Sequence, residues 1–100
     1  MDLALQGKRV IVTGGSKGIG RSITEAFLKE GARVAICARD EATLAIAAAE
    51  LSELGEVHYH TADLSTASAA EEFVNWAAAE LGGLDVLVSN VSAIDRKSVV

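Results

Sequence analysis

A chain of 100 residues, half of them hydrophobic, has the length and composition of one small globular domain. Its net charge is −5 and its nine lysines and arginines are scattered, so neither nucleic acid nor an anionic membrane is an expected partner. The chain shows no secretory leader pattern and no apolar run of about 18 residues that could span a membrane, so we expect a cytoplasmic location.

Short runs rich in valine and isoleucine alternate along the chain with longer segments of helical period. The expected strands are residues 8–13, 33–38, 56–61 and 85–89, and the expected helices are residues 18–30, 40–55 and 65–81. Strands joined through helices run parallel, and apolar strands indicate a sheet that is covered on both faces. We therefore predict an α/β fold, a Rossmann-like doubly wound parallel sheet with strand order 3-2-1-4. One helix should cover one face and two helices the other.

Apolar spacing predicts which residues of each helix turn toward the sheet. The expected inward residues are Ile19, Ile23, Ala26 and Phe27, then Leu44, Ala47, Ala48, Leu51 and Leu54, then Ala70, Phe73, Val74, Ala77, Ala78 and Leu81. Asp40 is expected to cap the second helix, and Gly31 and Gly82 to end the first and third. Cys37, the single cysteine, lies in the apolar second strand and is interpreted as a buried core residue rather than a reactive thiol.

A glycine-rich segment, Thr13-Gly14-Gly15-Ser16-Lys17-Gly18-Ile19-Gly20, separates the first expected strand from the first expected helix. Gly14 permits a tight turn, Gly18 lets the backbone approach a pyrophosphate, and Gly20 lets the helix pack close to the sheet. The helix amino terminus then offers N–H groups and a positive dipole end to phosphates. This pattern predicts a dinucleotide site, and a glycine-rich turn without a ligand is the alternative. It is not a P-loop, because no Gly-Lys-Ser/Thr follows.

The spacing Thr-Gly-x-x-x-Gly-x-Gly resembles the glycine pattern of the short-chain dehydrogenases/reductases. The resemblance continues in register through Thr61-Ala62-Asp63-Leu64 and through residues 84–92, which are similar to the family's fourth strand and its Asn-Asn-Ala-Gly ending. Only Asn90 of that ending is kept. The resemblance implies that residues 1–94 are the amino-terminal part of an NAD(P)-binding Rossmann domain. The cofactor-binding residues that it implies are Gly14, Ser16, Lys17, Gly18, Ile19, Gly20, Arg39, Asp63, Leu64 and Asn90.

The end of the second strand bears on the choice of nicotinamide cofactor. An NAD-preferring domain usually carries an acid here, about 20 residues past the glycines, but this chain has Ala38 followed by Arg39. A guanidinium binds phosphate bidentately, and Lys17 can reach the same 2′-phosphate from the glycine loop. Because the pair resembles NADP(H)-preferring members of the family, we expect NADP(H), with solvated surface charges as the alternative. Asp40 is a rival ligand for a ribose 2′-hydroxyl, but helix capping is its better interpretation.

Other polar and aromatic residues have plainer interpretations. His58 and His60 should share one face of the third strand, but no cysteine or carboxylate cluster supports a metal there, so no metal is expected. Trp76 is interpreted as a partly buried packing residue. Asp63 has an alternative role as a turn or capping residue.

The resemblance also implies what lies outside this chain. The family's catalytic serine and Tyr-x-x-x-Lys follow the fourth strand, and Tyr59, the single tyrosine, has no lysine four positions on. We therefore expect no catalytic residue and no turnover in the chain itself. The complete protein is expected to be a homo-oligomeric oxidoreductase that moves hydride between NADP(H) and a small carbonyl or alcohol substrate, similar to the 3-oxoacyl-thioester reductases. The alternative is a non-catalytic dinucleotide-binding module or sensor.

Residues 95–100, Asp-Arg-Lys-Ser-Val-Val, follow the point where the resemblance fades. The codons GAT CGG AAG AGC GTC GTG would encode them, and that string resembles sequencing-adapter read-through. We interpret these six residues as a non-native tail. A genuine basic tail on a natural short protein is the alternative.

Overall fold

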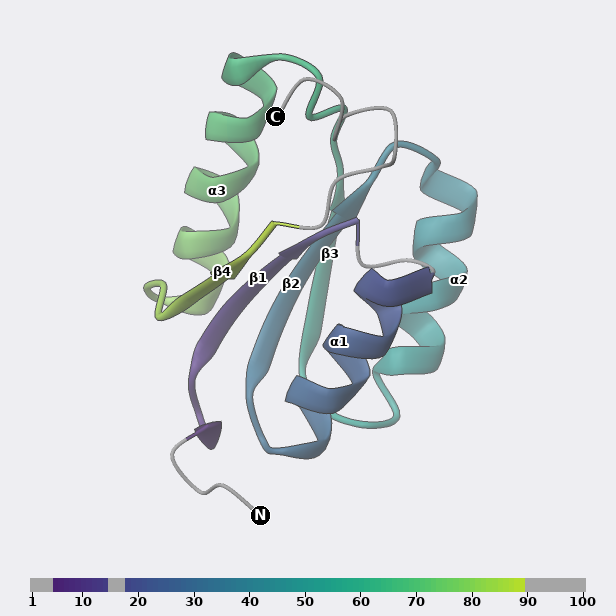
Figure 1. The fold of residues 1–100 in the computed structure, drawn as a ribbon, viewed down its shortest axis with the longest axis vertical. Helices are drawn as coiled ribbons and strands as arrows, with labels where there is room; N and C mark the ends of the chain where they lie inside the picture. Colours follow the sequence, from purple (N-terminus) through teal and green to yellow (C-terminus); the bar gives the residue numbers. More distant parts are fainter. Residues whose placement is uncertain (1–4, 15–17, 90–100) are drawn as a thin grey trace.

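The computed structural model describes residues 5–14 and 18–89. Ser16, Lys17, Asn90 and the tail at 95–100 lie outside this part of the chain. The described elements alternate in the order β1 (Arg9–Thr13), α1 (Gly18–Lys29), β2 (Arg33–Ala38), α2 (Glu41–Leu51), β3 (Val57–Thr61), α3 (Ala67–Leu81) and β4 (Val86–Val88). All pairs of neighbouring strands are parallel, and the order across the sheet is β3-β2-β1-β4 (Figure 1). The predicted fold class and strand order are confirmed.

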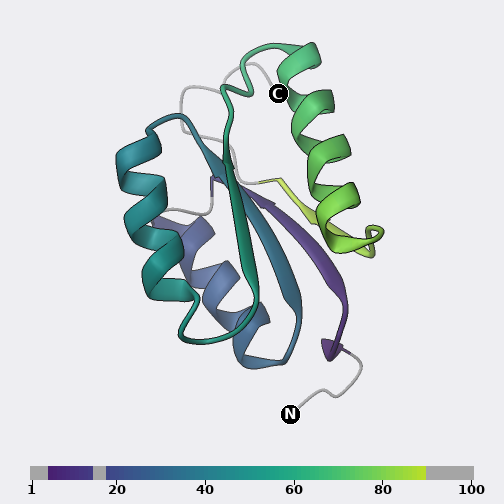
Figure 2. The same ribbon diagram turned by 180° about the vertical axis from the view of Figure 1, so that it is seen from behind.

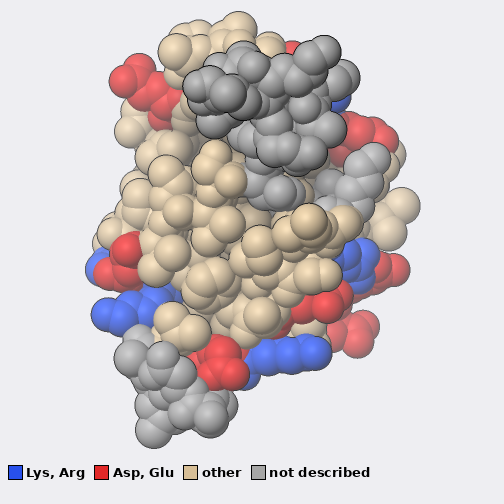
Figure 3. Space-filling model, viewed as in Figure 1, with Lys and Arg blue, Asp and Glu red and all other residues tan. Residues whose placement is uncertain are grey.

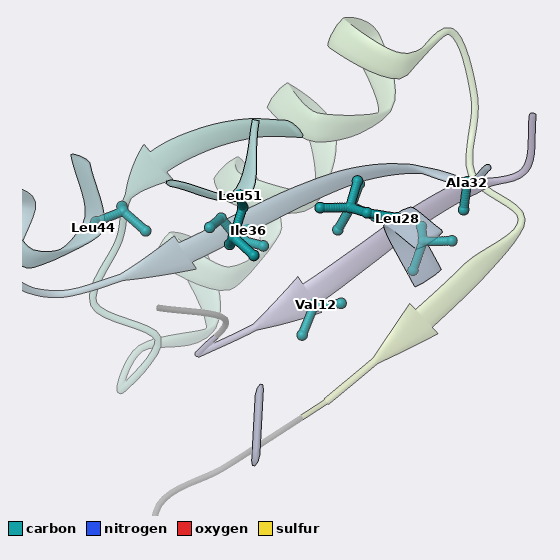
Figure 4. Packing of buried hydrophobic residues seen from close by; sticks show 8 residues of the cluster. Val12, Leu28, Ala32, Ile36, Leu44 and Leu51 are labelled. Atoms are coloured by element: carbon teal, nitrogen blue, oxygen red, sulfur yellow. The ribbon is translucent and has the colours of Figure 1, made fainter. Parts of the chain in front are cut away.

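The two central strands are buried because helices cover both faces of the sheet. Figures 1 and 2 show α1 and α2 on one face and α3 on the other, as predicted. Val12 and Ile36 pack on the first face with Leu28 of α1 and with Leu44 and Leu51 of α2 (Figure 4). A separate cluster on the second face joins neighbouring positions of the same strands to α3, and it comprises Ile11, Ala35, Cys37, Phe73, Ala77 and Leu81. Because side chains alternate between the two faces of each strand, β1 and β2 contribute residues to two separate cores.

Local capping fixes where the helices begin and end. The Asp40 side chain accepts a hydrogen bond from the Ala42 amide, and Thr66 does the same for α3 by accepting from the Ala69 amide at 3.2 Å. Gly82 ends α3 in the left-handed conformation, at φ +81°, which a residue with a Cβ rarely adopts. The predicted capping roles of Asp40 and Gly82 are confirmed. β4 is shorter than expected, because only Val86–Val88 pair with β1.

The predicted inward face of α1 is wrong in part. Ile19 is 71% exposed and Ala26 is exposed, whereas Gly20, Thr24 and Leu28 are the buried residues of this helix. The helix turns its small residues toward the sheet, and the Thr24 hydroxyl donates to the Gly20 carbonyl at 2.9 Å, so that this polar group is satisfied in the core. Ile23 and Phe27, the other two residues predicted to face the sheet, are half-buried and pack against the core as expected.

The inward faces of the other two helices agree better with the prediction. Leu44, Ala47, Ala48 and Leu51 of α2 are buried, as expected. Leu54 is an exception at 40% exposed, because α2 ends at Leu51 and the chain turns away before reaching it.

Candidate functional site

The chain leaves β1 through a turn that needs glycine. Gly14 has φ +68°, a backbone conformation that residues with a Cβ rarely adopt, and its amide donates to the Cys37 carbonyl at 2.9 Å. This hydrogen bond therefore joins the turn to β2 just where the chain leaves β1. The predicted role of Gly14 in a tight turn fits this geometry.

The amino terminus of α1 is open at the next glycine. Gly18 has φ +63° and is exposed, and a Cβ built on it would meet nothing within 4 Å. The first amides of a helix have no partner within the helix itself, so those at Gly18, Ile19 and Gly20 lie at the end of α1 that favours an anion. Gly20 itself is buried. This end of α1 thus combines a backbone that only glycine adopts readily with open space in front of it.

Three further predicted residues follow β2 and β3, at the carboxyl edge of the sheet where the glycine turn also lies. Arg39 is exposed and makes no ion pair with any residue in the described ranges. Asp63 is exposed, whereas Leu64 is half-buried against the α3-side core. Ligands of open parallel sheets bind outside this edge, so the structure brings the described candidates together where such a ligand would sit.

Asp63 is held in a local turn. Its Oδ1 accepts from the Ser65 amide at 3.0 Å. Hydrogen bonds from the Ser65 amide and hydroxyl lower the pKa of Asp63, and the positive charge of Arg39 lowers it further. The turn role considered as an alternative is therefore present in the structure. The carboxylate also lies close enough to Arg39 for their charges to interact.

Asp40 directly follows Arg39 but bonds to its own helix. Its Oδ1 accepts from the Ala42 amide at 3.2 Å and its Oδ2 accepts from the Thr43 hydroxyl at 2.5 Å. The sequence indicated the cap but not the contribution of Thr43. A serine or threonine at the third position after a capping aspartate, where its hydroxyl can donate to the carboxylate, is the signal that could have identified it.

The two histidines of β3 share one face of the strand, as predicted. That face meets α3, since His60 stacks on Trp76 with ring centroids 4.8 Å apart and His58 approaches Glu80. His58 Nε2 lies 2.7 Å from Glu56 Oε2, and its Nδ1 lies 3.5 Å from Glu80 Oε1. The two carboxylates therefore contact different nitrogens of the ring. Within the described residues no group of three His, Cys, Asp or Glu side chains could hold a metal ion. Half-buried Trp76 also stacks on Phe73, which agrees with its predicted packing role.

Among the described residues, the face viewed in Figure 3 shows no basic patch. Basic and acidic side chains lie beside one another toward its margins, and uncharged residues occupy most of its centre. No helix among the described residues combines the length and apolar character that crossing a membrane requires.

Comparisons with known proteins agree with this architecture. The sequence model of the short chain dehydrogenase family matches residues 8–99. YvrD of Bacillus subtilis, an uncharacterized oxidoreductase, is 39% identical over 97 residues, which are 97% of this chain and 36% of that protein. The rhamnolipids biosynthesis 3-oxoacyl-(acyl-carrier-protein) reductase of Pseudomonas aeruginosa is 44% identical over 88 residues, or 87% of this chain and 34% of the reductase.

A solved structure, the Pseudomonas aeruginosa RhlG/NADP active-site complex, matches with a TM-score of 0.80 and 43% identity, covering 89% of this chain and 36% of that one. The chain therefore spans about one third of the length of these matched proteins.

Proposed function

The chain belongs to the short-chain dehydrogenase family, and from that premise we propose that it is the NADP(H)-binding portion of an oxidoreductase. The complete enzyme would transfer hydride between NADP(H) and a carbonyl or alcohol substrate. The observation that carries the proposal is the open amino terminus of α1 at Gly18, which shares the carboxyl edge of the sheet with the exposed Arg39.

Each residue of the candidate site has a proposed role toward the dinucleotide. The turn at Gly14 and the first amides of α1, from Gly18 to Gly20, would hold the pyrophosphate, together with Ser16 and Lys17 of the same loop. Asp63 and Leu64 would contact the adenine, and Asn90 would line the cleft beyond β4. When bound, the nicotinamide supplies the hydride, whereas the residues of this chain bind and orient the cofactor.

NADP(H) is proposed over NAD(H) because of the charges at the end of β2. Arg39 is exposed and makes no ion pair within the described residues, so its guanidinium can donate hydrogen bonds to a 2′-phosphate. Asp40, the nearest acid in sequence, is bound to α2. The relative solved as an NADP complex supports the same choice.

Calorimetric titration of the chain with NADPH and with NADH tests this proposal. Tighter binding of NADPH is the expected result, because only NADPH carries the 2′-phosphate. Equal affinity for the two cofactors would contradict the assignment of NADP(H), and no binding of either would contradict the dinucleotide site.

The catalytic chemistry is proposed only for the complete protein, which we take to be a cytoplasmic homo-oligomer. For the chain itself, binding without turnover is the expected behaviour, because its sequence contains no Tyr-x-x-x-Lys. Purified chain should therefore give no NADPH-dependent carbonyl reduction above background. Clear turnover would show that the chain carries a catalytic group of another kind.

A further inference from the structure

Arg39 has two acidic neighbours that could neutralise it. Asp40 is the next residue in the chain, and Asp63 is close enough for the charge of Arg39 to affect its carboxylate. Neither acid forms an ion pair with Arg39 in the described part of the chain. Both are instead engaged by hydrogen bonds from residues two or three positions further on.

Two groups at the start of α2 donate to the Asp40 carboxylate, and one of them is a side-chain hydroxyl. The Ala42 amide is a backbone group and binds Oδ1 at 3.2 Å, whatever side chain residue 42 carries. Thr43 Oγ1 donates to Oδ2 at 2.5 Å and is the shorter of the two contacts. A hydrogen bond to a charged acceptor is stronger than one between neutral groups, so Thr43 contributes substantially to the orientation of this carboxylate.

We propose that Thr43 is a positioning residue for cofactor choice: its hydroxyl holds the Asp40 carboxylate on the amino end of α2, away from Arg39 and from the ribose 2′ position. This inference rests on the proposed function, in which Arg39 binds the 2′-phosphate. Without the Thr43 hydroxyl, Oδ2 of Asp40 loses this donor and is freer to turn toward Arg39, and pairing with Arg39 weakens binding of a 2′-phosphate. The carboxylate can also accept a bond from a 2′-hydroxyl, which favours the cofactor without the phosphate.

The substitution Thr43→Val removes the hydroxyl and keeps the β-branched shape, so the helix propensity of the position changes little. The probes are 2′,5′-ADP and 5′-AMP, which differ by the 2′-phosphate alone and do not need the nicotinamide half of a site. Their dissociation constants are measured on the chain by calorimetry or by amide chemical shifts. Thr43→Val should lower the preference for 2′,5′-ADP about three- to tenfold, because only part of the free energy of the lost charge-assisted hydrogen bond appears in the binding of the ligand.

Two controls separate positioning from simple damage. Thr43→Ser keeps a hydroxyl at the same place and should retain the preference of the unchanged chain. In an Asp40→Ala background Thr43→Val should change nothing further, because the group on which it acts is gone. If Thr43→Val fails to fold, Thr43→Ala serves as the second variant without a hydroxyl.

The outcomes divide cleanly. The role of Thr43 would be overturned if Thr43→Val kept the preference for 2′,5′-ADP, or if it weakened the binding of both ligands equally. It would also be overturned if Thr43→Val still lowered the preference in the Asp40→Ala background. Equal binding of the two ligands by the unchanged chain would instead overturn the NADP(H) proposal, and this inference with it.

Discussion

Arg9 and Asp85, which are 76 positions apart, form a two-pronged ion pair at the amino edge of the sheet. Arg9 Nε lies 2.9 Å from Asp85 Oδ2, and Arg9 Nη2 lies 3.2 Å from Oδ1. The backbones pair as well, because the Asp85 amide donates to the Arg9 carbonyl at 2.8 Å. Arg9 also donates from Nη1 to the Gly82 carbonyl at 2.8 Å, so it joins the end of α3 to the start of β1. This contact aligns β4 with the sheet at the edge opposite the candidate site.

The pH dependence of stability should reveal this pair. Hydrogen bonds from the Arg9 guanidinium and amide lower the pKa of Asp85 from 3.8 to about 2. A carboxyl whose pKa is lower in the folded than in the unfolded chain stabilises the fold above its unfolded value, and the contribution is lost as the pH falls toward 2. Asp85→Asn should therefore lower the urea midpoint at pH 7, and the difference from the unchanged chain should shrink between pH 4 and pH 2.

Glu53→Gln is the matched control for this experiment, because Glu53 is an exposed carboxylate without an ion pair in the described ranges. It should leave the urea midpoint almost unchanged at both ends of that pH range. A constant difference between Asp85→Asn and the unchanged chain from pH 7 to pH 2 would mean that the charge of Asp85 contributes nothing.

Alanine substitution at Gly18 and at Gly82 should separate the effect of backbone strain on stability from an effect on cofactor binding. Both have positive φ, +63° and +81°, and a Cβ on either would meet nothing within 4 Å. Substitution by alanine should therefore cost each about 1–2 kcal/mol of folding free energy through backbone strain alone. Only Gly18→Ala should also weaken NADPH binding, because its Cβ enters the space proposed for the pyrophosphate. Chemical denaturation and calorimetry of the two variants check this, and equal effects on binding would argue against a phosphate site at Gly18.

Arg39→Asp should reverse the cofactor preference. The variant loses a charge-assisted pair with the 2′-phosphate, worth about 1.5–3 kcal/mol, and introduces an acid that can accept from a 2′-hydroxyl. NADPH binding should weaken while NADH binding is spared or improved. The measurement is the ratio of the two dissociation constants, or of kcat/KM in the complete enzyme. An unchanged ratio would show that Arg39 does not bind the phosphate.

The sequence predicted the alternation of elements and the strand order, because the buried segments Val10–Val12 and Val34–Cys37 are apolar and glycines mark the boundaries between elements. It predicted only part of the inward face of α1, because hydrophobicity measures transfer from water and not how closely a helix approaches a sheet. Small Gly20 and Thr24 allow close approach, and bulky Ile19 does not.

Contacts across the fold were also beyond prediction. Arg33 pairs with Glu56 and donates to the Leu81 carbonyl at 2.8 Å, and no local pattern marks partners 23 and 48 positions away.

At the candidate site, the glycine spacing identified the turn. The contribution of the Thr43 hydroxyl was missed, although it lies three positions after the capping Asp40, because only the backbone donors of the cap were considered.

Cys37 provides a last prediction, because it reports on the core beneath the candidate site. Its side chain is buried on the face of β2 that α3 covers, and burial raises the pKa of its thiol. Since the thiolate is the reactive species, an aromatic disulfide reagent at pH 8 should label the folded chain slowly. The labelling should accelerate with urea in step with the loss of helical circular dichroism, because exposure requires opening of the core. The chain has no other cysteine, so the signal is unambiguous. Rapid labelling that is insensitive to urea would show that α3 does not stay packed over β2.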